Sequence, residues 1–319
     1  MADTTRERRF TIDKVLNTRS PAQIVWTVLI LILAVATINS VARNKGFEWG
    51  TVGDYFLSRP ILHGLLKTLE LTALSSVVGF VGGTLLAVMR LSGGGLASGA
   101  AQLYIWFFRG TPLLVQIIFW FNLGALYHTI SFGVPWGPTF WHADSNSVIT
   151  PFTAAILGLG LNAAAYMSET VRAGIQSIHH GQSEAAHALG LTKVQTLFHI
   201  LLPQAMRVIV PPAANEVISM LKYSSLVYVI AVPELLYSAQ IIYSRTFQTI
   251  PLLMVASLWY LIVTTVLTIV QHYIEKYFAK GVRVNARAAA RAGTTTGGTE
   301  ADDAAALEPL ALAGKGDLR

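Results

Sequence analysis

"SEAAHALGLTKVQTLFHILLP", residues 183–203, is a polar island in a chain whose residues are 53% hydrophobic. The run 184–189 favours a helix, and Gly190 suits the left-handed position that ends one. Thr192 and Gln195 have the spacing of a capping box, in which the two residues exchange side-chain to backbone hydrogen bonds and start the next helix. The stretch therefore predicts a helix, a tight turn and a second helix lying on one surface of a membrane.

The composition around this island predicts an integral membrane protein. The chain has 319 residues, of which 13% are charged, and a mean hydropathy of +0.52; that is too little polar surface to cover a soluble fold. It has no Cys, which excludes disulfides, Cys-ligated metals and thiol catalysis. The net charge is +6, but the basic residues follow the ends of apolar runs, so no nucleic-acid partner is expected.

Six apolar runs are long enough to span a membrane. A helix needs about 20 largely apolar residues to cross the hydrocarbon, because lipid cannot satisfy an exposed backbone. We therefore expect an all-α integral membrane fold with six transmembrane helices. The expected spans are residues 22–41, 62–91, 112–132, 151–172, 212–232 and 251–274.

The third span is interrupted by a charge. Arg109 in the middle of a continuous span would cost about 2.5–3.5 kcal/mol. Thr111 and Pro112 have the pattern of an N-cap followed by Pro at the first helical position, so we expect the span to begin there. Residues 99–108 then form a membrane-surface segment. The fifth span repeats this device, with Pro211 and Pro212 opening it.

The distribution of Lys and Arg predicts the orientation. With the N-terminus inside, nearly all basic residues near span ends face the cytoplasm, and the outer side holds Arg43, Lys45, Arg59 and Arg245. This bias places both termini and the stretch 183–203 in the cytoplasm. The loop 133–150 has two Pro, two Trp and no Lys or Arg, which is typical of an external loop at the membrane interface.

The polar island has the features of a docking element. Ala185 and Ala186 allow a partner's backbone or groove to approach closely, and Glu184 offers a charge to a basic partner. The residues alone leave open the alternative of a solvated connecting loop.

The residues of this stretch resemble the signature of a known protein family. Glu184, Ala185, Ala186, Gly190, Ile200, Leu202 and Pro203 have the spacing of the EAA signature of permease subunits of ABC importers. The stretches "FFRGTPLLVQ" (107–116), "AAYMSETVRAGIQSIHHGQSEAA" (164–186) and "LKYSSLVYVIAVPELL" (221–236) are similar to its polar amino acid branch, which serves histidine, glutamate, glutamine, arginine and opines. The likeness covers residues 61–277.

The resemblance implies a division of the chain and a set of partners. Residues 61–277 would be a five-helix type I permease domain, 1–60 a cytoplasmic lead with an extra transmembrane helix and an outer loop, and 278–319 a disordered cytoplasmic tail. The EAA residues would contact a dimer of ATPase subunits, which uses ATP and Mg²⁺. The chain itself has no G-x-x-x-x-G-K-[ST] sequence, so we expect a transport subunit that is not an enzyme and binds no cofactor.

The same resemblance implies an inner-membrane location in a bacterial cell. A second permease subunit, identical or related, would complete the path, and an extracytoplasmic solute-binding protein would deliver the substrate. Membrane lipid would surround the spans.

Two intramembrane charges are candidates for the substrate path. Lys222 could meet a substrate carboxylate, with Ser224 and Ser225 donating hydrogen bonds, or it could fix helix packing through an internal contact. Glu70 could receive a substrate ammonium, but Lys67 stands three residues earlier on the same helix face, and a local ion pair is an equally simple interpretation.

Other polar and small residues have structural interpretations. Glu169 and Arg172 have the spacing of an ion pair that supports the polar island. Gly79, Gly82 and Gly83 are expected to permit close helix packing. Asn215 and Glu216 are either gate elements or interfacial residues. His179, His180 and His187 lack the spacing of metal ligands, and no metal site is expected.

Two other functions stay open from the residues alone. An ion-coupled secondary transporter of small polar solutes would use Lys222 and Glu70 as coupling charges. A membrane-embedded enzyme is a weaker alternative, because the chain offers no paired intramembrane carboxylates or Ser/His/Asp set.

Overall fold

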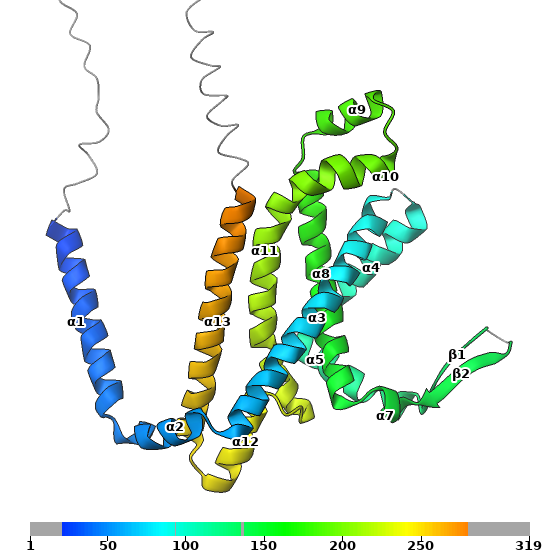
Figure 1. Ribbon diagram of the computed structural model, residues 1–319. Helices are drawn as coiled ribbons and strands as arrows, with labels where there is room; N and C mark the ends of the chain where they lie inside the picture. Colours follow the sequence, from blue (N-terminus) through cyan, green and yellow to red (C-terminus); the bar gives the residue numbers. More distant parts are fainter. Residues whose placement is uncertain (1–20, 93, 135–136, 280–319) are drawn as a thin grey trace, which may run out of the picture.

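The computed structural model describes residues 21–92, 94–134 and 137–279. The charged lead and the predicted disordered tail lie almost wholly outside these residues. The described chain is mostly helical, with long helices side by side and short elements at both ends of the bundle (Figure 1).

The long helices agree with a membrane protein. Four helices of the described residues are long and apolar enough to span: Ala22–Arg43, Arg59–Leu91, Lys193–Ile230 and Thr249–Phe278. A fifth span results if the bent pair Gly95–Gly110 and Leu113–Phe121 counts as one. The structure thus identifies four or five candidate spans where the sequence predicts six. The predicted span that is not among them is 151–172, which forms α8, Pro151–Gln176.

The long elements are α1 (Pro21–Arg43), α3 (Arg59–Leu91), α4 (Gly95–Gly110), α5 (Leu113–Phe121), α8 (Pro151–Gln176), α11 (Leu202–Tyr223) and α13 (Thr249–Ala279). The short helices are η2 (Lys45–Phe47), α2 (Trp49–Phe56), α6 (Leu123–Leu126), α7 (Ser145–Val148), α9 (His180–Ala188), α10 (Lys193–Gln195), the π-helix η3 (Thr196–Leu201), the 3₁₀-helix η4 (Ser224–Ile230) and α12 (Leu235–Thr246).

Close packing of α3 against α8 forms the centre of the bundle. A Cβ built on Gly79 would lie 2.7 Å from Cβ of Ala163, and one on Gly83 would lie 2.6 Å from Cβ of Met167. A Cβ on Gly82 would lie 3.0 Å from Cβ of Ala164. The prediction that these glycines permit close helix packing is confirmed.

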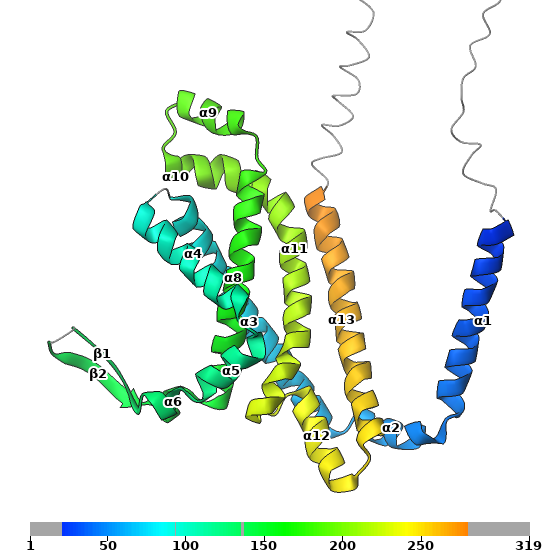
Figure 2. The ribbon, with the colours of Figure 1, turned by 180° about the vertical axis from the view of Figure 1, so that it is seen from behind.

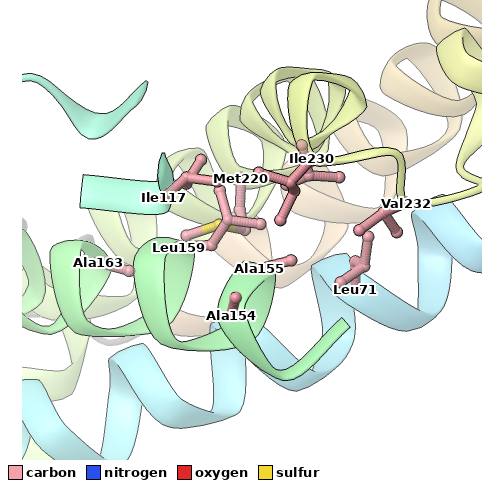
Figure 3. Packing of buried hydrophobic residues seen from close by; sticks show 10 residues of the cluster. Leu71, Ile117, Ala154, Ala155, Leu159, Ala163, Met220, Ile230 and Val232 are labelled. Carbon is pink, nitrogen blue, oxygen red and sulfur yellow. The ribbon is translucent and has the colours of Figure 1, made fainter. Parts of the chain in front are cut away.

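A buried apolar cluster joins this pair to the neighbouring helices. Figure 3 shows Ile117 of α5, Leu159 of α8 and Met220 of α11 close together, and Leu71 of α3, which belongs to the same cluster, beside Val232. Val227 of η4 completes the contact and, like the others, is almost fully buried. The side chains that hold the bundle together thus come from five elements.

The third predicted span starts within one residue of its predicted start, because α5 begins at Leu113, but its predicted end at residue 132 is wrong. Residues 99–108 belong to α4, which packs on α3 and α8, and α4 meets α5 at a bend of 102°. Thr111 does not cap α5. Its hydroxyl donates instead to Phe107 O, in the last turn of α4, over 2.9 Å. Pro112 breaks the helix because it has no N–H for the carbonyl of Phe108, four residues earlier.

The fifth span begins elsewhere than predicted. Pro211 and Pro212 lie inside α11, which starts at Leu202 with Pro203 in its first turn. The two prolines deprive the carbonyls of Arg207 and Val208 of their helical donors, and both of those residues are exposed. The α-helix ends at Tyr223 and continues as η4 to Ile230.

A β-hairpin follows α6 instead of helix or loop. Strands β1 (Thr129–Gly133) and β2 (Thr139–Asp144) pair antiparallel, so the predicted span to residue 132 is corrected here, and the mostly helical fold predicted as all-α carries one two-stranded hairpin. The predicted loop 133–150 contains β2 and α7. Asp144 starts α7 by accepting hydrogen bonds from the backbone N–H groups of Asn146 and Ser147.

The first helix stands apart from the bundle. Figures 1 and 2 both show α1 separated from α13 and joined to it through α2 at one end. The indole N–H of Trp259 on α13 donates to Phe56 O over 2.9 Å, and the two rings stack. This contact holds α2 in place and thereby places α1.

Candidate functional site

The polar island folds as a helix–turn–helix. Gly190 ends α9 with φ +76°, a left-handed conformation that glycine adopts without strain. Thr192 and Gln195 form the predicted capping box, with N–H of Thr192 donating to Oε1 of Gln195 over 2.9 Å. Figure 1 shows α9 and α10 beyond the ends of α8 and α11. The predicted helix, tight turn and capped second helix are confirmed, and the second helix continues through η3 into α11.

The two alanines of the island have different surroundings. Ala186 is 3% exposed and packs inward, whereas Glu184 and Ala185 are exposed. Gly190 and Pro203 are also exposed, and Ile200 and Leu202 are half-buried.

Large apolar side chains lie exposed on this island. Leu189 is 82% exposed, Val194 65% and Phe198 58%. Leu189 lies in the turn outside the candidate spans, whereas Val194 and Phe198 lie at the start of the helical run 193–230, next to the polar residues of the turn. Apolar groups exposed together in this way are typical of a protein interaction surface. None of the three is among the residues predicted from the sequence, although apolar residues inside a polar stretch are a visible signal.

A polar cavity of about 430 Å³ lies at the bend between α4 and α5. Its walls come from the bend itself, from α8 and from α11. The polar side chains that line it are Arg109, Thr111, Asn162, Tyr166, Glu216 and Tyr223. A cation and a carboxylate thus share one hollow.

The two charges of the cavity are held differently. The guanidinium of Arg109 lies 5.1 Å from the centroid of the Tyr166 ring, and its Nη1 is 3.8 Å from Oε1 of Glu169. The carboxylate of Glu216 is half-buried and has no hydrogen bond or ion pair with any other described residue. Arg109 was predicted to lie at the membrane interface, and Glu216 was predicted to be either a gate element or an interfacial residue.

Amide side chains hold the bend open. Nε2 of Gln116 donates to Phe108 O over 2.9 Å and to Thr111 O over 3.1 Å. Nδ2 of Asn162 donates to Phe108 O over 3.0 Å and contacts Oε1 of Gln116. These bonds replace the donor that Pro112 lacks, so the cavity wall is fixed by polar groups that sequence reasoning did not identify.

Glu169 has more partners than the one predicted. Arg172 donates to Oε2 of Glu169 from Nε over 2.9 Å and from Nη2 over 2.6 Å, which confirms the predicted pair. Arg90 of α3 pairs with Oε1 of the same carboxylate. One carboxylate therefore links α3, α8 and the Arg109 side chain.

The predicted substrate-path residues lie outside the polar cavity. Lys222 is exposed and has no side-chain partner among the described residues. Ser224 and Ser225 donate their hydroxyls to Leu221 O and Lys222 O, both over 2.6 Å. Glu70 pairs with Lys67 over 2.7 Å, which matches the local ion-pair interpretation.

The described residues contain no group of three or more potential metal ligands. His187 bonds to Ser183 O within its own helix.

Comparison with known proteins identifies the family. The profile of the "binding-protein-dependent transport system inner membrane component" family matches residues 79–283. The chain belongs to this family. Members are membrane-embedded transport subunits, so this permease is a multi-pass membrane protein and not the ATP-hydrolysing part of its system.

Curated relatives of this permease are named for amino acid transport. The chain is 45% identical to the arginine transport system permease ArgU of Corynebacterium glutamicum, over 81% of this chain and 80% of ArgU. It is 37% identical to the L-cystine permease TcyB of Bacillus subtilis, over 74% and 93% of the two chains. It is 32% identical to the glutamine permease GlnP of Escherichia coli, over 72% and 96%.

Solved structures share the fold of this permease. A crystal structure of an amino acid ABC transporter with histidines matches with a TM-score of 0.58 and 32% identity, over 68% of this chain and 94% of that chain. The inward-facing MetNI methionine ABC transporter matches with a TM-score of 0.57 over 70% and 100% of the two chains. Its identity of 20% supports the fold alone.

Proposed function

We propose that this permease takes up polar amino acids in an ATP-driven importer of the bacterial inner membrane. The named substrates of its relatives, arginine, cystine and glutamine, are amino acids. Family membership supports the import class, and the substrate class rests on these relatives.

The exposed apolar side chains of the helix–turn–helix carry the proposal of ATPase coupling. Leu189, Val194 and Phe198 are more than half exposed, and each would gain free energy by entering a groove of a partner. Glu184 and Ala185 lie on the same exposed island. A cytoplasmic ATPase subunit is the partner we propose, with Ala186, Ile200 and Leu202 supporting the fold of the loop and Gly190 and Pro203 shaping it.

The polar cavity is the proposed substrate path. The Arg109 guanidinium is a geometric match for an α-carboxylate, and the unpaired Glu216 carboxylate suits an ammonium. A charge pair of this kind selects zwitterions. Lys222, Ser224, Ser225 and Glu70 remain predictions for other points on the path.

The proposed assembly contains two permease subunits, two ATPase subunits that use ATP and Mg²⁺, and an extracytoplasmic solute-binding protein. We propose six spans, with the bent pair α4–α5 and α8 both crossing. The basic residues near the span ends then place both termini in the cytoplasm. Residues 61–277 form the permease domain, and α1 is an addition to it.

Uptake in proteoliposomes tests the proposal. We expect the permease, reconstituted with its ATPase and binding protein, to accumulate labelled arginine, glutamine or cystine only when ATP is supplied. Uptake driven by a proton gradient without ATP would contradict it and favour a secondary transporter.

One substitution tests the coupling surface. Leu189→Asp should abolish stimulation of the ATPase and its co-purification with the permease, because a charge replaces an apolar contact. Phe247→Asp is the matched control, since Phe247 is 88% exposed in the turn between α12 and α13. Full ATPase association of the Leu189→Asp variant would contradict the docking role.

A further inference from the structure

The β-hairpin between α6 and α7 extends away from the bundle. Figures 1 and 2 show β1 and β2 projecting sideways at the end opposite α9, connected to the bundle only through α6 and α7. The strands are mostly exposed, with Phe132 at 74% and Trp141 at 49%. A two-stranded ribbon is marginally stable in water without a surface to cover it.

The register of the hairpin gives it two different faces. Residues directly opposite in an antiparallel pair lie on the same face. Ile130 pairs with Ala143 and Phe132 with Trp141, which makes one face apolar.

The other face is polar. Ser131 pairs with His142 and Thr129 with Asp144. Phe140 is the additional residue at a β-bulge beside Gly133, so the alternation does not assign it to either face. The ribbon is therefore amphipathic.

The chemistry of the apolar face matches the boundary between lipid and water. Trp and other aromatic residues are enriched at that boundary, and amphipathic segments lie in it with the apolar face turned to the acyl chains. Residues 110–171 contain no Lys or Arg, so the ribbon carries no cation for an acidic partner protein. Asp144 already accepts hydrogen bonds from the backbone of α7.

The position of the ribbon favours lipid over other partners. The figures show it beside the lower half of α13, near the end of α11 at which the chain continues as η4. Exposed apolar side chains lead to it along the chain, from Val115 and Phe119 of α5 to Leu126. The apolar face thus continues a surface that a membrane protein turns to lipid.

We propose that the hairpin 129–144 is a membrane-interface anchor whose Ile130, Phe132, Trp141 and Ala143 face enters the headgroup and acyl-chain boundary of the leaflet opposite α9. The anchor joins α5 to α8, the helices on either side of the polar cavity. It therefore restrains the outer end of both cavity walls. The inference goes beyond the transport function and does not depend on which solute is carried.

The absence of Cys from the chain permits a direct test. Four single-Cys variants, Phe132→Cys and Trp141→Cys on the apolar face and Ser131→Cys and His142→Cys on the polar face, are labelled with an environment-sensitive fluorophore. The assembled transporter is placed in nanodiscs of phosphatidylethanolamine and phosphatidylglycerol. Quenching by nitroxide-bearing lipid is compared with quenching by aqueous iodide.

We expect lipid-borne nitroxide to quench the two apolar-face labels by about threefold more than the two polar-face labels, and iodide to show the reverse order. Each face has two positions, so the comparison survives the loss of one variant to misfolding. Equal iodide quenching at all four sites would overturn the proposal, because the ribbon would then stand in water.

Two further results would replace lipid by a protein partner. Protection of Phe132→Cys from both quenchers, together with disulfide cross-linking between two permeases, would assign the face to a second copy of the chain. Protection that appears only when the solute-binding protein is added would assign it to that protein. Either result overturns the membrane anchor.

Discussion

The hydroxyl of Tyr260 on α13 donates a hydrogen bond to Oε2 of Glu234 over 2.9 Å. The same carboxylate accepts from N–H of Leu236 over 2.9 Å and from N–H of Tyr237 over 2.7 Å, at the start of α12. Glu234 is fully buried. The hydroxyl of Thr68 on α3 donates to Oε2 of the same carboxylate over 3.4 Å and accepts from N–H of Leu235 over 3.0 Å. One carboxylate therefore holds α3, α12 and α13 together.

Loss of this carboxylate should destabilise the fold. Glu234→Ala leaves the hydroxyl of Tyr260 and two backbone N–H groups without their acceptor, at about 1–3 kcal/mol for each buried group that finds no water. We expect a fall in the thermal unfolding midpoint of the purified permease. Tyr260→Phe removes one donor and should lower the midpoint less.

Tyr273→Phe is the control for that comparison. Tyr273 lies on α13, as Tyr260 does, but is 66% exposed, so its variant should keep the unfolding midpoint of the parent protein. Equal midpoints for all three variants would show that Glu234 does not tie the helices together.

Two glycine substitutions should have opposite effects on stability. Gly79→Ala places a methyl group 2.7 Å from Cβ of Ala163, and such overpacking costs about 1–3 kcal/mol. A Cβ on Gly99 would meet nothing within 4 Å, and Ala is favoured over Gly in a helix by about 0.5–1 kcal/mol. Unfolding midpoints should therefore fall for Gly79→Ala and stay equal or rise for Gly99→Ala. A fall of similar size in both would indicate a general intolerance of glycine replacement.

Local signals in the sequence predicted the features that depend on neighbouring residues. Thr192 and Gln195 form a capping box because both partners lie within one helical turn. Gly190 ends α9 through its own left-handed φ, which requires no distant contact. The span 151–172, predicted from its apolar run, lies within α8, whose start is also set by neighbouring residues, Thr150 as the N-cap and Pro151 in the first turn. Ion pairs three residues apart, such as Glu169 with Arg172, were predictable for the same reason.

Features that depend on distant contacts were not predictable in this way. Pro112 was predicted to open a helix and α5 begins directly after it, but the bend before it, stabilised by Asn162 far along the chain, was not predicted. Pro211 and Pro212 looked like a helix start, yet α11 continues through them. The partners of Glu169 on α3 and α4 and those of Glu234 likewise come from other helices, so no spacing rule brings them together.

The shared carboxylate of Glu169 should matter more than the pair between Lys67 and Glu70. Glu169→Gln removes the charge that faces Arg90, Arg109 and Arg172 and leaves three guanidiniums close together, which we expect to cost about 1–3 kcal/mol. Glu70→Gln breaks one partly exposed pair, worth about 0–1 kcal/mol.

Unfolding midpoints and uptake check this contrast. Glu169→Gln should reduce both, because the freed Arg109 guanidinium also lines the polar cavity. Glu70→Gln should leave both near the parent values. A larger loss in Glu70→Gln would contradict the assignment and support the role of Glu70 on the substrate path.

The amide of Gln116 should be needed for the bend that shapes the cavity. Gln116→Leu keeps the size of the side chain but leaves Thr111 O without its donor, and leaves Phe108 O with Asn162 alone. A buried carbonyl that loses its partner costs about 1–3 kcal/mol, so the unfolding midpoint should fall. Uptake should fall further than the midpoint explains, because Thr111 lines the cavity and its backbone would shift to find water.

Gln102→Leu on the exposed face of α4 is the matched control, and equal uptake by the two variants would show that the bend is held by the backbone alone.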